Sequence, residues 1–281
     1  MAAIGVIEAF ERNKMPIDFI VGTSIGSIVG GLYAAGYSTE QLKALIDTTD
    51  WEDLLSLTGE SHRRDLFYDQ KLAEDRSILI LRFDGLEPVI PESFSTGQRL
   101  TNYLNILALQ ATYQPLPTFD QLKIPFRAAT TDLISGKRFI IGRGDLHEAM
   151  RASVTVPLLF SPVKRDTTLL LDGGLISNIP ADVAHEWGAD IIVVVDVTSP
   201  LRPASNLNAP WEIADQIIGI IMQLANQEQL KYADYVIRPD IGSHLSSDFT
   251  KLDSLILRGE EAADLILPFI RQEYEVLLEK S

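Results

Sequence analysis

The sequence predicts an α/β fold of three layers, in which a mainly parallel central sheet lies between two layers of helices. Strand-sized apolar segments alternate with helix-like segments through most of the 281 residues, and this alternation is typical of parallel sheets with helices on both faces. The apolar fraction of 46% and the charged fraction of 22% are ordinary for a globular chain that buries a substantial core. We therefore expect a single domain over residues 1–281.

Helices are predicted where apolar residues recur every three or four positions and where a capping residue or a proline marks an end. Ser38 is such a capping residue, and Pro16 follows the first helix. Gly30 and Gly31 lower the helix propensity of their segment, which indicates close packing of that helix on the sheet. The predicted helices are residues 2–13, 24–35, 38–46, 96–113, 146–153, 181–187, 211–224 and 252–277.

Strands are predicted where short apolar runs lie between turn residues. Ser135-Gly136 separates two such runs by a tight turn, which favours a pair of adjacent strands. The run at residues 190–197 is apolar without alternation, as in strands that are buried on both faces. The predicted strands are residues 17–21, 78–83, 124–132, 137–142, 169–171, 190–197 and 235–239.

The helix predicted at residues 211–224 is apolar on more than one side. Its isoleucines and leucine recur too often for a single buried stripe: Ile213, Ile217, Ile218, Ile220, Ile221 and Leu224. We interpret it as a helix of the core, and a surface that contacts lipid is the alternative interpretation.

Composition excludes several kinds of partner and site. The formal net charge is −15, so a nucleic-acid partner is not expected, because such binding needs clustered lysine and arginine. Anionic membranes would repel the chain as well, and a lipid would have to be reached through local apolar surface. No run is long enough to cross a bilayer, and the N-terminus lacks the pattern of an export signal. The chain has no cysteine, which excludes disulfides and thiolate metal sites and leaves the compartment open.

A G-x-S-x-G motif stands between a predicted strand and a predicted helix. It consists of Gly22, Thr23, Ser24, Ile25 and Gly26. In this context the motif predicts a nucleophile elbow, in which a strained turn exposes the serine hydroxyl. We expect a side chain at either glycine to crowd the neighbouring backbone. The start of the helix supplies free N–H groups and a positive dipole end, which favour an oxyanion there. The alternative is a turn with a helix cap at Ser24.

A serine hydroxyl needs a base within hydrogen-bond reach, so a carboxylate or histidine at the end of a strand is the natural partner. Asp172 ends the predicted strand at residues 169–171, which we expect to be parallel, and Gly173 and Gly174 allow a turn beside it. Taken alone, the Asp-Gly-Gly sequence is also typical of an ordinary turn.

Histidines offer a second interpretation, because an α/β-hydrolase triad would pair Ser24 with a later histidine. His185 falls inside a predicted helix and His244 in a loop, so neither is well placed for this role. His62 and His147 show no ligand spacing, and we expect no metal site.

Two further aspartates, Asp132 and Asp196, also end predicted strands. Catalytic groups can lie at such ends, but a cap or turn residue is the simpler interpretation of both.

Five segments, in order along the chain, resemble the patatin-like phospholipase family, which uses a Ser-Asp dyad. They are residues 4–7, 17–27, 129–133, 151–157 and 172–180. The resemblance implies that Ser24 is the nucleophile and Asp172 its proton acceptor. It also implies that Ile25 N–H donates to the oxyanion and that the motif glycines are Gly22, Gly26, Gly173 and Gly174.

The resemblance implies a serine lipid acyl hydrolase that cleaves carboxylic ester bonds of phospholipids or other acyl lipids, with no metal or organic cofactor. Transient contact with a membrane surface is expected, and the oligomeric state is left open. Residues 232–262 are most similar to bacterial members, so both a cytoplasmic protein and an exported part of a longer outer-membrane protein are consistent with the sequence.

One departure from the family concerns the N-terminus. The family normally begins with a strand and a glycine-rich loop whose N–H groups form much of the oxyanion hole, and both would precede Ala2. We expect a domain that is shortened at this end. Loss of one oxyanion donor typically costs about 10²–10³ in rate, and loss of a central strand would expose backbone edges. One alternative is therefore a fragment that binds lipid or protein without turnover. The other alternative, which comes from the histidines discussed above, is a Ser-His-Asp esterase.

Overall fold

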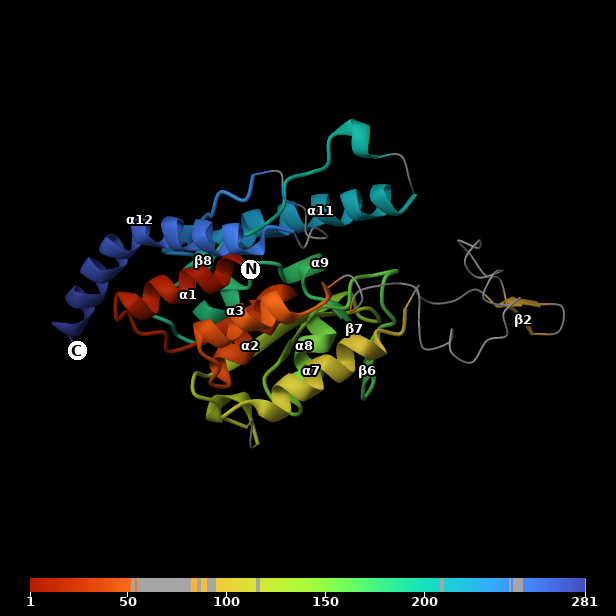
Figure 1. The fold of residues 1–281 in the computed structure, drawn as a ribbon, viewed down its shortest axis with the longest axis horizontal. Helices are drawn as coiled ribbons and strands as arrows, with labels where there is room; N and C mark the ends of the chain where they lie inside the picture. The colour runs from red at the N-terminus through yellow and green to blue at the C-terminus, as the bar shows by residue number, and fades with distance from the viewer. Residues whose placement is uncertain are drawn as a thin grey trace.

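The computed structural model describes residues 1–51, 54, 82–84, 87–89, 95–114, 117–207, 210–242, 244 and 250–280, and it has a mixed α/β architecture (Figure 1). Its α-helices are α1 (Ala2–Arg12), α2 (Ile25–Ala34), α3 (Thr39–Thr48), α7 (Gln98–Gln110), α8 (Leu146–Ser153), α9 (Gly174–Ser177), α10 (Ala181–Glu186), α11 (Pro210–Gln229) and α12 (Leu252–Leu278). Three short 3₁₀ helices are η1 (Phe119–Gln121), η2 (Ala204–Asn206) and η3 (Leu230–Tyr232).

The described strands form one larger sheet and two pairs. They are β1 (Ile20–Thr23), β2 (Arg82–Asp84), β3 (Glu87–Val89), β4 (Phe126–Asp132), β5 (Lys137–Ile141), β6 (Val163–Arg165), β7 (Thr168–Asp172), β8 (Val193–Val195) and β9 (Tyr235–Ile237). The larger sheet has the order β1-β4-β7-β6, and β5 also pairs with β4. The other two sheets pair β2 with β3 and β8 with β9.

Most predicted elements are present with shifted ends. The helix predicted at residues 146–153 is α8, and Ser38 caps α3 in a reciprocal box, in which Ser38 Oγ accepts from Gln41 N–H and Gln41 Oε1 accepts from Ser38 N–H. The strand expected at residues 190–197 is only the three residues of β8. Of the strand predicted at residues 78–83, the part before β2 lies outside the described residues.

The prediction of a mainly parallel sheet is wrong. Among the described strands, β1 pairs with β4 and β8 with β9 in parallel, whereas β4 pairs antiparallel with both β5 and β7, as β6 does with β7 and β2 with β3. The turns between β4 and β5 and between β6 and β7 are only a few residues long, and such turns return the chain antiparallel. A parallel neighbour needs a crossover of a dozen residues or more.

Helices cover both faces of β4, as a layered α/β fold requires. A Cβ added to Gly31 of α2 would lie 3.3 Å from the ring of Phe126 and 3.3 Å from the sulfur of Met150 in α8. This close approach confirms the packing predicted from the glycine pair. Arg127, whose side chain alternates to the other face, places its guanidinium 3.7 Å from the ring centroid of Trp187, which follows α10. The central sheet between helices is therefore confirmed.

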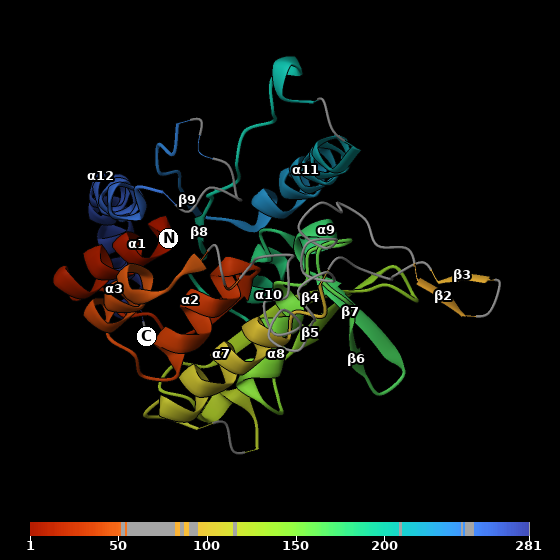
Figure 2. The same ribbon diagram turned by 45° about the vertical axis from the view of Figure 1, so that its right-hand side comes forward.

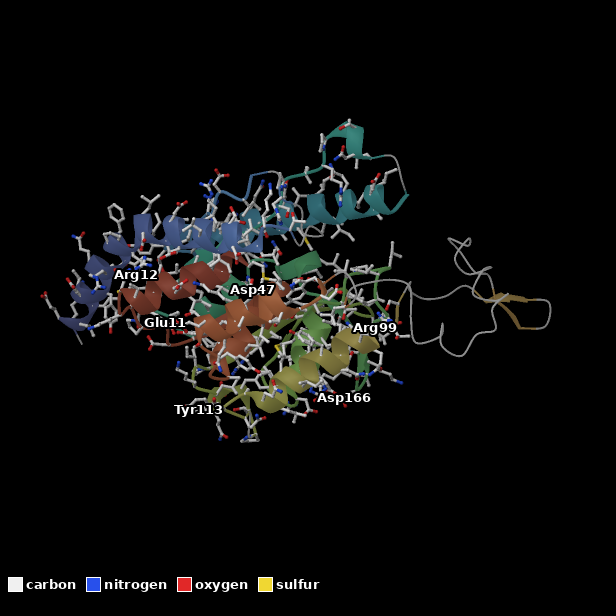
Figure 3. The ribbon with its side chains drawn as sticks, viewed as in Figure 1. Glu11, Arg12, Asp47, Arg99, Tyr113 and Asp166 are labelled. Atoms are coloured by element: carbon white, nitrogen blue, oxygen red, sulfur yellow. The ribbon has the colours of Figure 1, made fainter. Side chains whose placement is uncertain are left out.

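Helix α1 lies along α12, and Figures 1 and 2 show the two side by side. Their backbones approach closely, because Cβ atoms at Gly5 and Gly259 would stand 1.8 Å and 1.9 Å from carbonyl oxygens of the opposite helix. Arg12, labelled in Figure 3 at the end of α1, forms ion pairs with Glu260 and Asp264 of α12. Glu11, beside it, accepts hydrogen bonds from side chains of α2 and α3. The first helix and the last helix of the described chain are thereby packed together.

Helix α11 is not the core helix that its composition suggests. Along one side its large apolar residues are exposed: Ile213, Ile217, Ile220, Ile221 and Leu224. The opposite side packs on α9 and contributes Ile218 and Met222 to the wall of a cavity. The expectation of a buried helix is wrong for its outer side, since α11 lies above the sheet and only its inner side meets the rest of the molecule (Figure 2). None of the described helices is long and apolar enough to cross a bilayer.

Candidate active site

Ser24 stands between β1 and α2 in a strained backbone conformation, with φ of +52° and ψ of −129°. Residues other than glycine rarely adopt such angles, and they persist only where surrounding bonds hold them. Here Ser24 N–H donates to Ser153 Oγ at 2.9 Å, and Ser27 Oγ donates to the Ser24 carbonyl at 2.7 Å. The predicted elbow geometry is therefore present.

Ser153, at the end of α8, holds the backbone of the elbow. Its hydroxyl is fully buried, donates to Ala129 C=O of β4 at 2.7 Å and accepts from Ser24 N–H. The chain of two hydrogen bonds joins the sheet to the elbow. Because Ser24 N–H is used in this way, it is not a donor for substrate. The sequence marks Ser153 only as a member of the segment at residues 151–157.

Asp172 accepts a hydrogen bond from Ser24 Oγ, with 2.7 Å between Oγ and Oδ2. The other carboxylate oxygen, Oδ1, accepts from Gly174 N–H at 2.8 Å. The residue is 2% exposed, and this burial raises the pKa of Asp172 to about 6, against the opposing effects of the two hydrogen bonds. A carboxylate with a pKa in this range is ionised at neutral pH and is still basic enough to accept a proton.

The register of β4 brings the two residues together. Ala129 pairs with Thr23 at the end of β1, and the next residue, Thr130, pairs with Asp172 at the end of β7. Since β5 occupies the other edge of β4 along this stretch, β1 and β7 share one edge, and their C-terminal ends meet there. Asp172 therefore reaches Ser24 from an antiparallel strand, and the expected parallel strand is corrected.

Ile25 is the first residue of α2, and its N–H has no acceptor among the residues that the structure describes. The first N–H groups of a helix lack partners within the helix and favour negative charge. Ser27 N–H is already bonded to Ser24 C=O at 2.8 Å. The amide of Ile25 is thus available next to Ser24.

A cavity of about 1050 Å³ opens beside Ser24 and Asp172. Apolar side chains dominate its wall, which is formed by β1, β8, α1, the end of α12 and the inner side of α11. Within the described residues, β1 pairs only with β4, and β8 pairs only with β9. Each of the two strands therefore has one edge without a neighbouring strand. A mostly apolar space next to a serine and a buried carboxylate suits an ester with a long hydrocarbon part.

Other candidate residues lie outside this arrangement. The ring of His185 stands 5.3 Å from that of Tyr232, and neither His185 nor His244 bonds to Ser24 or Asp172. Asp132 accepts from Ile134, Ser135 and Leu169 N–H groups, so it fixes the turn after β4.

Asp196 pairs with Arg238 and accepts from Thr198 N–H. His147 lies on α8, and His62 is outside the described residues. In the described part of the chain, no three side chains of metal-binding type form a cluster.

The motif glycines differ in what they require. A Cβ at Gly22 would lie 2.5 Å from Gly26 C=O, and one at Gly173 would lie 2.3 Å from Ala129 C=O, so both positions exclude a side chain. A Cβ at Gly174 would meet the mobile end of Met222. The expected crowding at Gly26 is wrong, because nothing lies within 4 Å of a Cβ there.

We expect Gly22→Ala to lower the free energy of unfolding by about 1–3 kcal/mol, because the added methyl group overlaps backbone that cannot move without disturbing α2. Gly26→Ala is the matched control and is expected to leave stability unchanged or raise it by up to about 1 kcal/mol, since alanine favours the helix. Urea unfolding of both variants measures the difference. Equal stabilities would contradict the close approach at Gly22.

The mixed α/β fold and the elbow serine beside a buried carboxylate place the protein in the class of hydrolases. The chain belongs to the patatin-like phospholipase family, whose family model matches residues 1–185. This membership confirms the resemblance that the five segments carry.

Patatin-like phospholipase domain-containing protein 6 of Mus musculus is 26% identical over 282 residues, which cover 90% of this chain and 18% of that protein. Lysophospholipase NTE1 of Scheffersomyces stipitis is 26% identical over 287 residues, which cover 93% and 17%. The chain thus spans less than a fifth of these curated relatives. Among solved structures, VipD from Legionella pneumophila aligns over 95% of this chain and 64% of its own, with a TM-score of 0.45 and 14% identity.

Proposed function

We propose that the chain hydrolyses carboxylic ester bonds of phospholipids or other acyl lipids, with Ser24 as nucleophile and Asp172 as base. The observation that carries the proposal is the 2.7 Å hydrogen bond from Ser24 Oγ to the buried Asp172 carboxylate at the wall of the cavity. No histidine stands between the two groups, so the carboxylate takes the proton directly.

The reaction has two halves. As Ser24 Oγ attacks the acyl carbonyl, its proton passes to Asp172, and the oxyanion that forms is stabilised by Ile25 N–H. The alcohol then leaves with the proton from Asp172, and the acyl group stays on Ser24. Water, deprotonated by Asp172, attacks this ester, and the fatty acid is released as Ser24 regains its proton. These steps require no metal or organic cofactor.

The substrate class is an ester with a long acyl chain. The apolar wall of the cavity supports this choice, and the name of the fungal relative points to lysophospholipids as one member of the class. The testing experiment compares hydrolysis of a p-nitrophenyl ester, a lysophospholipid and a fluorogenic phospholipid by the parent chain and by Ser24→Ala. Turnover by the parent that Ser24→Ala retains in full would refute the proposal.

A second candidate function is binding of lipid or protein without turnover. The open edges of β1 and β8 in the described residues favour it. A folded parent that binds vesicles but hydrolyses none of the three esters would support this candidate.

Residues 1–281 are proposed to act as one domain. The family model ends at residue 185, but α11 packs on α9 and α12 packs along α1. Both later helices also line the cavity beside the dyad, so they belong to the same site.

Contact with a membrane surface is proposed to use the outer side of α11. We expect the double variant Ile217→Glu and Ile221→Glu to weaken binding to phosphatidylcholine vesicles at least tenfold, because these side chains, 53% and 43% exposed, would lose burial in lipid. Hydrolysis of the soluble p-nitrophenyl ester should stay within about twofold. Leu109→Glu is the control, since Leu109 is 70% exposed on the distant α7. Equal loss with the control would contradict a specific role of α11.

A further inference from the structure

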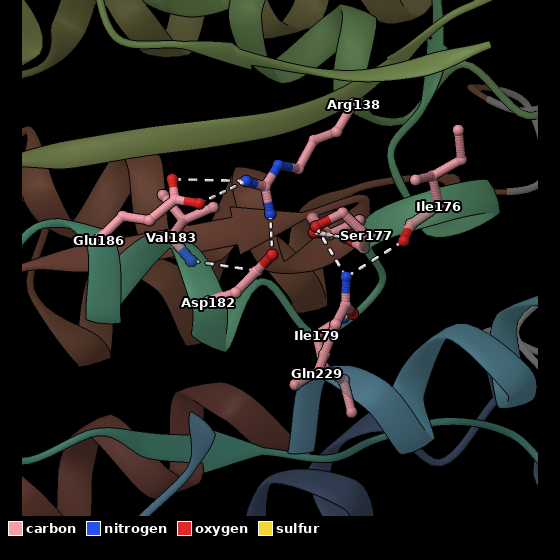
Figure 4. Close-up of polar contacts among 9 residues, drawn as sticks. Arg138, Ile176, Ser177, Ile179, Asp182, Val183, Glu186 and Gln229 are labelled. Carbon is pink, nitrogen blue, oxygen red and sulfur yellow. Dashed lines mark hydrogen bonds and ion pairs between the residues drawn. The ribbon is translucent and has the colours of Figure 1, made fainter. Parts of the chain in front are cut away.

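Gln229, the last residue of α11, is a buried polar side chain that the reaction itself does not use. It is 7% exposed, and its carboxamide makes three hydrogen bonds to one short segment (Figure 4). Nε2 donates to Ile176 C=O at 3.1 Å and to Ser177 Oγ at 3.0 Å, and Oε1 accepts from Ile179 N–H at 2.9 Å. A single side chain thus binds both the end of α9 and the link that follows it.

Helix α9, which Gln229 contacts, is too short to be stable through its own hydrogen bonds. Helix α9 has only four residues, one turn, and a single turn fixes several dihedral angles for one or two hydrogen bonds. Its last carbonyl groups have no partners within the helix. Gln229 supplies a donor to the Ile176 carbonyl, so α11 takes over the role that further turns of helix would have.

One end of α9 is hydrogen-bonded to Asp172, and the other end is hydrogen-bonded to the residue before Ser24. At its start, Gly174 N–H donates to Asp172 Oδ1 at 2.8 Å. At its end, the Ser177 carbonyl accepts from Thr23 Oγ1 at 2.7 Å, and Thr23 directly precedes Ser24. A displacement of α9 would therefore change the position of the base, the nucleophile or both.

Asn226 strengthens the same attachment. It lies three residues before Gln229, on the same side of α11, and is also buried. Its Oδ1 accepts from Asn178 Nδ2 at 3.1 Å, and its Nδ2 donates to Thr198 Oγ1 at 2.8 Å. The inner side of α11 therefore contacts residues 176–179 at both Asn226 and Gln229.

We propose that Gln229 is a positioning residue, which holds α9 where Gly174 N–H and Ser177 C=O fix the two members of the dyad. The inference rests on the proposed function for its effect on catalysis, but its effect on Asp172 can be measured without turnover. The role extends the site to the end of α11, the helix whose outer side is exposed.

The expected signature lies in the carboxyl group of Asp172. Burial raises its pKa, the Ser24 hydroxyl and Gly174 N–H lower it, and no charged side chain of the described residues contributes. When α9 loosens, the bond from Gly174 weakens, and the pKa of Asp172 rises further. A loss of general stability alone would not produce this shift in the folded protein.

The experiment uses Gln229→Met, which keeps size and removes all three hydrogen bonds. Its control is Gln227→Met, the same change at an exposed site on the same helix. Carbon-13 NMR of the aspartate carboxyl groups, assigned with Asp172→Asn, follows the titration of Asp172. We expect the pKa of Asp172 to be higher in Gln229→Met than in the parent and to be unchanged in Gln227→Met. In Gln229→Met, kcat should be about ten- to a hundredfold lower, with KM within about twofold of the parental value.

Thr23→Val breaks the other end of the attachment without a change in size and provides a second route if Gln229→Met folds poorly. It too should raise the pKa of Asp172. When both changes are combined, kcat should fall by less than the product of the two separate factors, because both act through α9. An unchanged pKa in Gln229→Met and Thr23→Val, or factors that multiply in full, would overturn the inference. Full activity of Ser24→Ala would instead refute the proposed function and leave the NMR result to decide on Gln229.

Discussion

Ser24→Ala is expected to lower hydrolysis of every ester substrate by roughly 10⁴- to 10⁶-fold, the largest effect of any single change in this chain. The reason is that, among the described residues, only Ser24 combines the strained turn between a strand and a helix with a hydrogen bond to the buried Asp172 carboxylate. The residual rate would come from binding and from Ile25 N–H alone. Initial rates on the p-nitrophenyl ester and on phospholipid, together with mass spectrometry after a fluorophosphonate probe, measure the loss.

The control for this variant is Ser205→Ala, because Ser205 is an exposed serine of η2, away from the elbow. The Ser205→Ala variant should react with the probe and hydrolyse ester at the parental rate. Thermal unfolding should show that Ser24→Ala is folded, since Ser24 Oγ makes one hydrogen bond and its removal creates little space. Labelling of Ser24→Ala at the parental rate would show that another residue is the nucleophile.

Asp172→Asn is expected to lower kcat by roughly 10²- to 10⁴-fold, because an amide cannot take the proton of Ser24. The amide oxygen can still accept from Gly174 N–H, so α9 should remain in place. Asp166→Asn is the matched control, in an exposed turn of the same hairpin (Figure 3), and should leave kcat unchanged. A variant at Asp172 with the parental kcat would show that a different group acts as base.

Asp172→Asn should also stabilise the protein at alkaline pH. The pKa of Asp172 is raised from 3.8 to about 6 in the folded chain, so between these values the folded state binds more protons than the unfolded state. The stability that the protonated carboxyl contributes is complete below about pH 4 and is lost as the pH rises through 6, at a total cost of about 3 kcal/mol. Asparagine avoids this cost.

Thermal unfolding at pH 5 and pH 8 checks the sign. The midpoint of Asp172→Asn should exceed that of the parent by more at pH 8 than at pH 5, while the parental kcat/KM should rise with pH and level off above about 6. A gain in stability that is larger at the acidic pH would contradict a raised pKa.

Several parts of the fold and the site could be predicted because their causes are local. The elbow at Ser24 depends on glycine at position 22 and on a strand followed by a helix, and both are readable over a dozen residues. The helix α8 and the capping box at Ser38 follow from local periodicity and local hydrogen bonds. In each case, nearby residues supply the partners.

The direction of the strands was not predictable in this way. A period of two indicates a strand and a buried side, but it is the same for parallel and antiparallel neighbours. The strands β6 and β7 form a short hairpin at the edge of the sheet, and the sequence of β6 gave no strand signal because none of its three residues is buried. The outer side of α11 was also misjudged, because composition does not say which apolar residues find partners.

The sequence by itself determined the elbow and the family, and it proposed Ser24 and Asp172 as the two reacting groups. Only the tertiary structure decided that Asp172 meets Ser24 across the shared edge of β4, that Ser153 holds the elbow and that Gln229 holds α9. The physical reason is the distance along the chain between the residues that interact. Turn and helix propensities act over a few residues, whereas these contacts join residues about 50 to 150 positions apart and exist only once the packing of strands and helices has fixed their register.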